Sequence, residues 1–342
     1  MSRRVLVAGG SGFIGDSLVR RLRTAGNWVR VADVHPPPFC QSTADEFLQL
    51  DLRDYTSCRT AAEGMDDVYQ LAADMGGIGY ITTRHAALTR NNILINSHML
   101  EAARKASVKR YLFTSSACVY PSNRQNDADV TPLQESDAIP ADPEKGYGWE
   151  KLFAEQLTTY YDEEFGLDTR IARFHNIYGP RGTYEGGREK APAALCRKVA
   201  LARDHTAIEI WGDGEQTRSF CFISDCVEGL TRLMDSGHSE PFNVGSDELV
   251  TIRELAQMII GISGKSLTVT TDPSKPQGVR GRNSDNRHLK EVLHWVPRVS
   301  LSSGLAETYQ WIWGQLAAAG RSLPPAPALA VAQAAMVGAA SH

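Results

Sequence analysis

The chain has 342 residues, of which 42% are hydrophobic, a composition that suits a globular protein with a substantial core. Its formal net charge of -4 argues against the basic surface of a nucleic-acid-binding protein. No apolar run reaches the length of a membrane-spanning helix, and no signal-peptide-like region follows the first residues. The six cysteines lack C-x-x-C spacing and no cluster has metal-ligand spacing. We therefore expect a soluble cytoplasmic protein without a metal ion, a nucleic-acid partner or a membrane partner.

The N-terminal segment reads as a strand, a glycine-rich turn and a helix. Residues 4–8 are apolar enough for a buried strand, and apolar residues recur at helical spacing over 14–22. The turn between them holds Gly9, Gly12 and Gly15 in G-x-x-G-x-x-G spacing. Such a turn lets the backbone approach a pyrophosphate, while the helix N-terminus faces its negative charge. The segment predicts a dinucleotide-binding site; the alternative is a glycine-rich structural turn in an unrelated α/β protein.

An acidic residue after the second strand indicates which dinucleotide is bound. Residues 28–32 read as a strand that ends in Asp33, about twenty residues beyond the turn. A carboxylate there can bind the ribose diol and repels a 2′-phosphate, which favours NAD over NADP. We expect the cofactor to contact Gly9, Gly12, Phe13, Ile14, Gly15, Asp33, Asp51, Leu52, Ala73, Tyr147 and Lys151.

Strands and helices continue to alternate up to about residue 180. The expected strands are 46–50, 68–72, 110–114 and 169–174, and the expected helices are 92–105 and 147–165. This alternation predicts a Rossmann-type, doubly wound parallel sheet covered by helices on both faces. Ligands of such a sheet gather beyond the carboxyl ends of its strands, where the segments 73–77, 115–118 and 175–180 lie.

The sequence changes character beyond residue 180. A helix is expected over 190–202, a strand over 208–211, another strand over 241–245 and a helix over 251–262. We predict a Rossmann domain over 1–180, with later segments interleaved, and a smaller mixed α/β substrate-binding lobe over 181–318. The alanine- and proline-rich residues 319–342 have no core pattern and are predicted to form a flexible tail.

Tyr147 and Lys151 are four residues apart and therefore lie on one face of the helix expected over 147–165. A phenol ordinarily titrates near a pKa of about 10, which is too high for an efficient base at neutral pH. A neighbouring ammonium lowers that pKa, so Tyr147 could remove a proton from a substrate hydroxyl. Many helices carry this spacing by accident, so the pair alone is weak evidence of catalysis.

Together with Ser116 and the glycine-rich turn, this pair resembles the extended short-chain dehydrogenase/reductase family. Within it, six blocks resemble the GDP-mannose 3,5-epimerase family: 72–77, 115–121, 173–180, 186–192, 211–219 and 278–286. The resemblance extends from the first strand to about residue 315. It implies permanently held NAD, a homodimer and GDP-mannose as the substrate.

The resemblance also implies a mechanism in which C4 of the mannose is first oxidised to a ketone. Tyr147 would take the hydroxyl proton, with Lys151 lowering its pKa and Ser116 bound to the same oxygen. The ketone makes the C3 and C5 protons removable, and Cys118 and Lys190 would act as base and acid on opposite faces. Nearby cations are expected to lower the pKa of the Cys118 thiol. Inversion at both carbons gives GDP-L-galactose, and inversion at C5 alone gives GDP-L-gulose. Taken singly, Cys118 reads as a buried apolar filler and Lys190 as a surface lysine.

The same resemblance supplies the residues expected to hold the nucleotide sugar: Gly76, Ser116, Cys118, Asn176, Glu189, Lys190, Lys198, Gln216, Arg218 and Arg282. An arginine can bind a diphosphate through two parallel hydrogen bonds. Arg280 and Arg282 are two residues apart, so only one need face the diphosphate, and we favour Arg282. We assign no catalytic role to His175.

Three other functions remain open at this stage. A C5-only epimerase releasing GDP-L-gulose would use the same residues. Another NAD-dependent nucleotide-sugar epimerase, such as a UDP-sugar 4-epimerase, is disfavoured by Cys118 and Lys190, because 4-epimerisation needs no carbon-acid chemistry. A non-catalytic NAD-binding sensor is disfavoured by the joint presence of Tyr147, Lys151 and Ser116.

Overall fold

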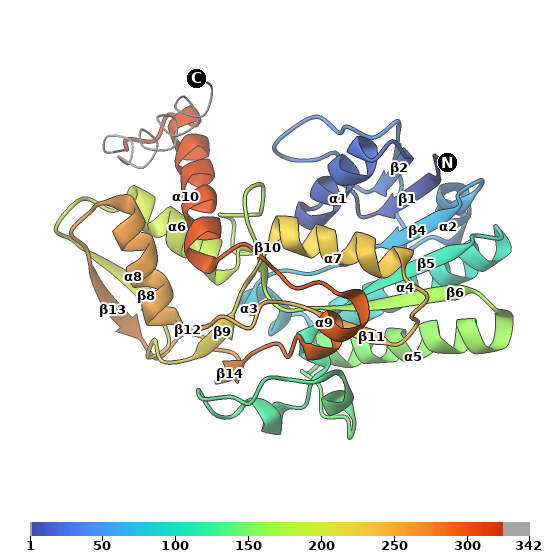
Figure 1. Ribbon diagram of the computed structural model, residues 1–342. Coiled ribbons are helices and arrows are strands. Elements are labelled where there is room, and N and C mark those ends of the chain that lie inside the picture. The colour runs from blue at the N-terminus through green and yellow to red at the C-terminus, as the bar shows by residue number, and fades with distance from the viewer. Residues whose placement is uncertain (1, 324–342) are drawn as a thin grey trace.

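The computed structural model describes residues 2–323, and its larger domain is built on a seven-stranded parallel sheet (Figure 1). The strand order is β11-β6-β5-β4-β1-β2-β3. The strands are β1 (Arg4–Ala8), β2 (Trp28–Asp33), β3 (Glu46–Gln49), β4 (Asp67–Gln70), β5 (Arg110–Ser116), β6 (Asp168–Phe174) and β11 (Pro241–Val244). Every pairing in this sheet is parallel, so the prediction of a Rossmann-type parallel sheet is confirmed.

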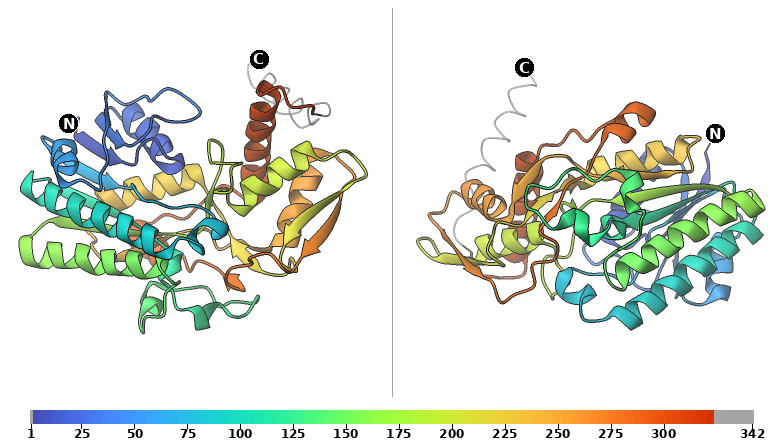
Figure 2. Two further views of the ribbon diagram at one scale, coloured as in Figure 1. Left: turned by 180° about the vertical axis from the view of Figure 1, so that it is seen from behind. Right: turned by 90° about the horizontal axis from the view of Figure 1, so that it is seen from below.

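Helices cover both faces of the sheet, as the doubly wound prediction requires (Figures 1 and 2). One face carries α1 (Phe13–Thr24) and α7 (Ile223–Asp235), joined by an ion pair of 2.5 Å between Arg21 and Glu228. The other face carries α2 (Tyr55–Ala62), α4 (His85–Lys105) and α5 (Tyr147–Phe165). Figure 2 shows α4 and α5 side by side in both views.

Alternate residues of the first strand fill two separate hydrophobic cores. Val5 and Val7 face the core under α1 and α7, whereas Leu6 and Ala8 face the core under α2, α4 and α5. Successive side chains of a strand point to opposite faces, so a strand buried on both faces reads as a continuous apolar run. The run therefore shows no alternation of apolar and polar residues and is still recognisable as a strand.

The C-terminal lobe is smaller and mixed, which confirms the predicted architecture. It contains α6 (Ala191–Leu201), α8 (Ile252–Ser263) and α10 (Leu301–Ala318). Strands β8 (Ala207–Trp211) and β13 (Thr268–Asp272) form a parallel pair, and β12 (Leu249–Thr251), β9 (Thr217–Ser219) and β14 (Gly281–Arg282) form a three-stranded sheet. The short elements are α3 (Ile78–Ile81), α9 (Arg287–Leu293), β7 (Ile177–Tyr178), β10 (Cys221–Phe222) and the 3-10 turns Ala117–Val119, Ser122–Gln125 and Glu135–Ala138.

Segments beyond residue 180 return to the larger domain, because β11 pairs with β6 and α7 covers the sheet. The proposed domain boundaries at 180 and 318 remain predictions. Most of the predicted tail, residues 324–342, lies outside the described residues. Helix α4 starts at His85, seven residues before the expected Asn92, and α7 and α10 were not anticipated.

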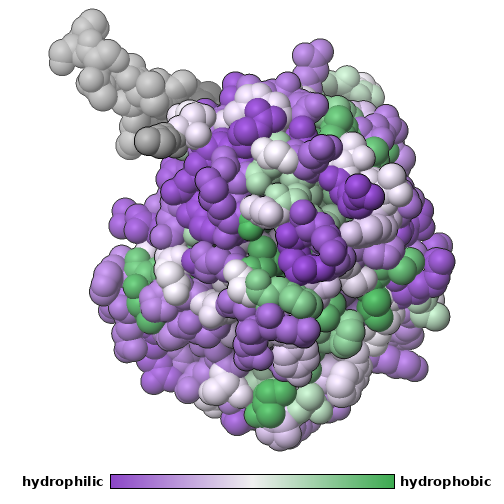
Figure 3. Space-filling model, turned by 90° about the vertical axis from the view of Figure 1, so that its right-hand side faces the viewer, coloured by the Kyte–Doolittle hydropathy of each residue, from purple (hydrophilic) through white to green (hydrophobic). Residues whose placement is uncertain are grey.

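No helix within residues 2–323 combines the length and the apolar character needed to cross a membrane. The end of the larger domain seen in Figure 3 is mostly hydrophilic, with hydrophobic side chains in small separate groups.

A buried ion pair joins α5 to β6. Arg173 donates two parallel hydrogen bonds to Glu155, of 2.9 and 2.7 Å, and Ser115 donates to the same carboxylate. Both charged side chains are almost fully buried. Removing one member of such a pair leaves an uncompensated buried charge.

We therefore expect Glu155→Gln to lower the free energy of unfolding by about 3–5 kcal/mol, measured by urea unfolding followed by circular dichroism. Glu215→Gln, which removes an exposed carboxylate paired with Arg253 at 2.9 Å, is the control and should cost no more than about 1 kcal/mol. Equal losses in the two variants would contradict this account of the Arg173–Glu155 pair.

Candidate active site

The sequence-predicted residues gather where the carboxyl ends of β1, β4, β5 and β6 meet the C-terminal lobe (Figure 1). The glycine-rich turn follows β1, the 73–77 segment follows β4, Ser116 ends β5, and Asn176 follows β6. Parallel strands present their carboxyl ends at one edge, so residues far apart in the sequence meet there.

The glycine-rich turn has no room for side chains at two of its positions. Gly9 has a φ of +78°, and a Cβ there would lie 2.6 Å from the Ala72 nitrogen. A Cβ on Gly15 would lie 2.2 Å from the Gly9 oxygen. Gly12 precedes α1 without a side-chain cap, so the N–H groups of Phe13 and Ile14 at the helix N-terminus remain open to an anion. The turn therefore fits a pyrophosphate, as predicted for a dinucleotide.

Asp33 ends β2 beside this turn, where its Oδ2 accepts a hydrogen bond of 3.0 Å from the Ser11 N–H. Burial raises the pKa of Asp33, and the Ser11 N–H opposes that rise. The carboxylate is thus held at the point where a ribose diol would arrive. Asp51 instead pairs with Arg53 at 2.5 Å, which lowers the pKa of Asp51. Leu52 is buried, and Ala73 lies in the segment after β4.

Tyr147 and Lys151 occupy the first turns of α5, and both are buried. The Lys151 Nζ lies 5.7 Å from the centre of the Tyr147 ring and donates a hydrogen bond of 3.1 Å to the Thr114 carbonyl. Burial raises the pKa of Tyr147 well above its ordinary value, and the charge of Glu150 adds to this rise. The expected lowering of the phenol's pKa by Lys151 is therefore not found in the protein alone. Burial also lowers the pKa of Lys151 itself.

Cys118 lies two residues beyond Ser116, in a 3-10 turn whose N-cap is Ser116: the Cys118 N–H donates to the Ser116 Oγ at 3.2 Å. The Arg282 guanidinium donates to the Cys118 Sγ at 3.5 Å. Burial nevertheless raises the pKa of the Cys118 thiol, the Glu144 carboxylate adds to the rise, and Arg282 opposes it. The expectation that nearby cations lower this pKa is thus wrong in direction, because burial outweighs the single close cation.

Lys190 is the N-cap of α6 and ends the loop that starts the C-terminal lobe. Burial lowers the pKa of Lys190, and the thiols of Cys118 and Cys226 oppose this, which places the ammonium within electrostatic reach of Cys118. The loop is pressed against the segment after β4. The Gly77 N–H donates to the Arg188 carbonyl at 3.1 Å, and a Cβ on Gly77 would lie 2.5 Å from the Glu189 oxygen.

Two arginines from the small sheet face this cluster. Arg218 on β9 and Arg282 on β14 are register partners. Arg218 donates to the backbone carbonyls of Thr217 and Val279, at 2.7 and 2.6 Å, and burial together with Arg282 lowers its pKa to about 9. Arg280 instead forms a bidentate pair of 2.8 Å with Asp213, so Arg282 is the arginine of this loop that faces the cluster.

The remaining predicted substrate contacts are held by other parts of the lobe. Asn176 has a φ of +46° and donates to the Ser219 carbonyl at 2.9 Å. Glu189 pairs with Arg197 at 3.2 Å, and the Lys198 Nζ donates to the Glu209 carbonyl at 2.7 Å. The Gln216 side-chain amide donates to the Trp211 carbonyl and accepts from the Gly214 N–H, both within one turn. The structure therefore gives Gln216 a turn-forming role that the sequence did not suggest.

The sequence-based prediction did not include several residues of the cluster. Gln125 accepts a hydrogen bond of 2.6 Å from Arg282, and Glu144 lies 3.9 Å from the same guanidinium. Glu150, next to Lys151, accepts a hydrogen bond of 2.8 Å from Asn92 of α4. Glu150 lies three residues beyond Tyr147 on α5, and that helical spacing was the available signal. Glu144 lies before the helix, so helical spacing does not apply to it. Gln125 gave no signal.

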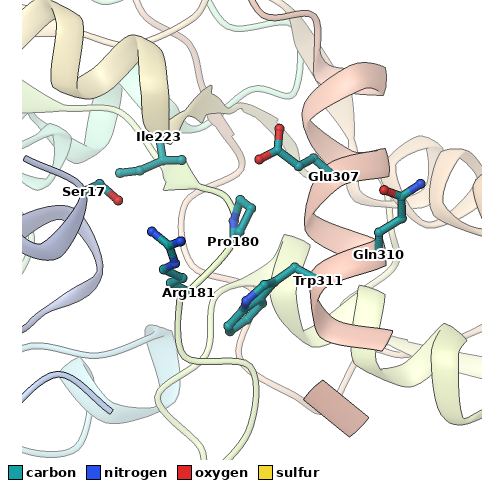
Figure 4. A pocket seen from close by; sticks show the side chains of 7 residues that line it. All are labelled: Ser17, Pro180, Arg181, Ile223, Glu307, Gln310 and Trp311. Carbon is teal, nitrogen blue, oxygen red and sulfur yellow. The ribbon is translucent and has the colours of Figure 1, made fainter. Parts of the chain in front are cut away.

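A separate surface cleft lies between α1, the segment after β7 and α10 (Figure 4). It is lined by Ser17, Pro180, Arg181, Ile223, Glu307, Gln310 and Trp311, none of which belongs to the cluster described above.

Comparison with known proteins agrees with this arrangement. Residues 5–245 match the NAD dependent epimerase/dehydratase family. The chain is 47% identical over 319 residues to GDP-mannose 3,5-epimerase of Arabidopsis thaliana, covering 92% of this chain and 83% of that protein. It is 31% identical over 321 residues to GDP-L-fucose synthase of Escherichia coli (strain K12), covering 90% and 96%. The structure of UDP-glucose 4-epimerase with UDP-glucose from Thermotoga maritima matches with a TM-score of 0.83 at 26% identity, covering 92% and 99%.

The position of Asp33 generates a prediction about the cofactor. Purified protein, once denatured, should release NAD(H) and no measurable NADP(H), because the carboxylate repels a 2′-phosphate. Asp33→Asn removes the charge but keeps an acceptor for the Ser11 N–H, so it should release a mixture of both, quantified by enzymatic cycling. Asp66→Asn is the control, since Asp66 precedes β4 at the other end of the strands and pairs with Lys109 at 2.8 Å. NADP(H) in the wild-type protein would overturn this role for Asp33.

Proposed function

The chain belongs to the NAD dependent epimerase/dehydratase family, and we propose that it inverts C3 and C5 of GDP-mannose, releasing GDP-L-galactose and some GDP-L-gulose. One observation carries the proposal: Cys118 packs with Tyr147 in one buried cluster and binds the Ser116 Oγ through its N–H, and the loop that ends in Lys190 packs on the segment after β4. A tyrosine and lysine suffice for oxidation and reduction of a sugar hydroxyl. A second acid–base pair is needed when a carbon centre is inverted.

The first half of the reaction belongs to Tyr147, Lys151 and Ser116. Tyr147 takes the proton of the C4 hydroxyl, and Ser116 holds the same oxygen. Lys151 is fixed by the Thr114 carbonyl and supplies the nearby positive charge that favours the phenolate against burial. When bound, NAD supplies the hydride acceptor for C4 and returns the hydride at the end.

The second half belongs to Cys118 and Lys190. Once C4 is a ketone, the protons on C3 and C5 become removable through an enolate. The raised pKa of Cys118 makes its thiolate a stronger base, and the lowered pKa of Lys190 makes its ammonium a stronger acid. A base from the β5 end and an acid from the α6 loop can approach the sugar ring from opposite faces, which inversion requires.

The diphosphate is proposed to bind Arg218 and Arg282. These neighbouring cations repel each other, and within residues 2–323 no carboxylate lies within 4.0 Å of Arg218, while Glu144 approaches Arg282 to 3.9 Å. A diphosphate would supply the missing negative charge. The further contacts proposed from the sequence are Gly76, Asn176, Glu189, Lys198 and Gln216 for the nucleotide sugar, and Gly9, Gly12, Phe13, Ile14, Gly15, Asp33, Asp51, Leu52 and Ala73 for NAD.

We further infer a homodimer, formed through α4 and α5. Large side chains at Trp149, Phe153 and Tyr160 are each more than half exposed, and their spacing of four and seven places them on one face of α5. Exposed apolar faces of this kind mark protein–protein contacts. We also propose a cytoplasmic location, because the six cysteines all lie within the described residues as free thiols.

Incubation with GDP-mannose in D2O tests the enzymatic proposal. The wild type should place deuterium on C3 and C5 of the recovered sugars and yield both GDP-L-galactose and GDP-L-gulose, identified by NMR. Tyr147→Phe should lose more than tenfold in turnover, equivalent to about 1.4 kcal/mol of barrier, because no group takes the C4 hydroxyl proton. Cys118→Ala should retain transfer of a C4 deuterium label to NAD but lose exchange at C5. Wild-type exchange in Cys118→Ala would make the thiol a packing residue.

The homodimer is tested by light scattering of the purified protein. Replacing Phe153 and Tyr160 together by Asp should shift the mass from that of two chains to that of one, because charges would be buried between the paired helices. Ile139→Asp, at another exposed apolar position, is the control and should leave the mass unchanged. A monomeric wild type would contradict the inference.

A further inference from the structure

Glu144 stands beside Cys118 and has no role in the mechanism above. Its N–H donates a hydrogen bond of 3.0 Å to the Cys118 carbonyl, and its carboxylate lies 3.9 Å from the Arg282 guanidinium that donates to the Cys118 thiol. Gly148 makes this packing possible, since a Cβ there would lie 2.2 Å from the Cys118 oxygen and 3.1 Å from the Glu144 Cβ. The Glu144 side chain is 23% exposed, whereas Cys118 is 7% exposed. Glu144 therefore connects an enclosed thiol with solvent.

The other ionisable groups that face the thiol have different positions and charges. Arg282 donates a hydrogen bond of 3.5 Å to the thiol, and the charge of the thiolate favours the charged forms of Lys151, Lys190 and Arg218, which raises their pKa against the effect of burial. Tyr147 is buried beside the thiol and is committed to the C4 hydroxyl. Among these neighbours in the described chain, Glu144 is the carboxylate, and therefore the group that can accept a proton from the thiol and pass it on.

Glu144 is not needed to hold Arg282. The Arg282 Nε donates to the Gln125 Oε1 at 2.6 Å, whereas the separation from Glu144 is 3.9 Å. The guanidinium is therefore held chiefly by Gln125, and its ion pair with Glu144 is the longer contact. The Glu144 carboxylate is thus available to accept a proton from the Cys118 thiol.

We propose that Glu144 is a positioning residue that carries the proton between Cys118 and water and so restores the thiolate before each inversion. This proposal rests on the proposed epimerase function. The Cys118 thiolate takes the proton from the sugar carbon, and the electron pair of the broken C–H bond enters the enolate. The S–H proton then passes to the Glu144 carboxylate and from there to water. Lys190, having given its proton to the opposite face, is reprotonated from solvent, so the protons balance.

The relay has a consequence for the products. GDP-L-gulose needs one inversion, whereas GDP-L-galactose needs two, so its formation requires the acid–base pair to be restored within a single turnover. Loss of the relay should therefore reduce GDP-L-galactose more than GDP-L-gulose.

The test compares Glu144→Gln, Glu144→Asp and the control Asp142→Asn with the wild type, using GDP-mannose in D2O and NMR. Asp142 is an exposed carboxylate two residues away that binds Ser122. Glu144→Gln should lower the maximal rate of C5 exchange at least tenfold and lower the ratio of GDP-L-galactose to GDP-L-gulose, with hydride transfer from C4 retained. Glu144→Asp should recover part of both, and Asp142→Asn should match the wild type.

The pH profile separates the relay from a purely electrostatic role. Glu144 raises the pKa of the thiol, so its removal should move the acid limb of the exchange profile to lower pH while the plateau falls. A shifted acid limb with an unchanged plateau and product ratio, or a change confined to KM, would overturn the relay. A wild type that does not convert GDP-mannose would overturn both the proposed function and the relay.

Discussion

The close approach of the α5 N-terminus to the end of β5 is the constraint on which the site depends. At Gly148 the backbone comes so near the Cys118 carbonyl that a Cβ would lie 2.2 Å from that oxygen. Any side chain at this position would push α5 away from the 3-10 turn that follows Ser116. Tyr147 and Lys151 would then move together, away from Ser116 and Cys118. One small residue thus keeps Tyr147 and Lys151 beside Ser116 and Cys118.

Burial shifts the pKa of four groups of this cluster, and each shift has the direction that the proposed chemistry needs. It raises the pKa of Tyr147 and Cys118 and lowers that of Lys151 and Lys190. The anionic forms become stronger bases and the cationic form of Lys190 a stronger acid, since burial penalises each charged form.

Features that follow from local sequence patterns could be predicted, whereas features that depend on contacts between distant residues could not. The strand, glycine-rich turn and Asp33 were recognisable because their spacing follows from backbone geometry. Helix α4 was placed too short because its first turns, from His85, carry few apolar residues at helical spacing. The pKa directions of Tyr147 and Cys118 were wrong because burial is not readable from a local motif. Gln125 and Arg282 are 157 residues apart, so no pattern could join them.

The position of Lys190 shows why inversion needs both domains. The thiol belongs to the turn after β5, whereas the ammonium belongs to the loop that opens the C-terminal lobe. Arg188 fixes that loop to the larger domain: its carbonyl accepts from the Gly77 N–H, and its guanidinium lies 4.0 Å from the centre of the Tyr80 ring. The Tyr80 hydroxyl in turn donates to Asp74 at 2.7 Å. In the proposed mechanism, the groups for oxidation at C4 come from one part of the chain, whereas the base and the acid come from the two sides of this contact.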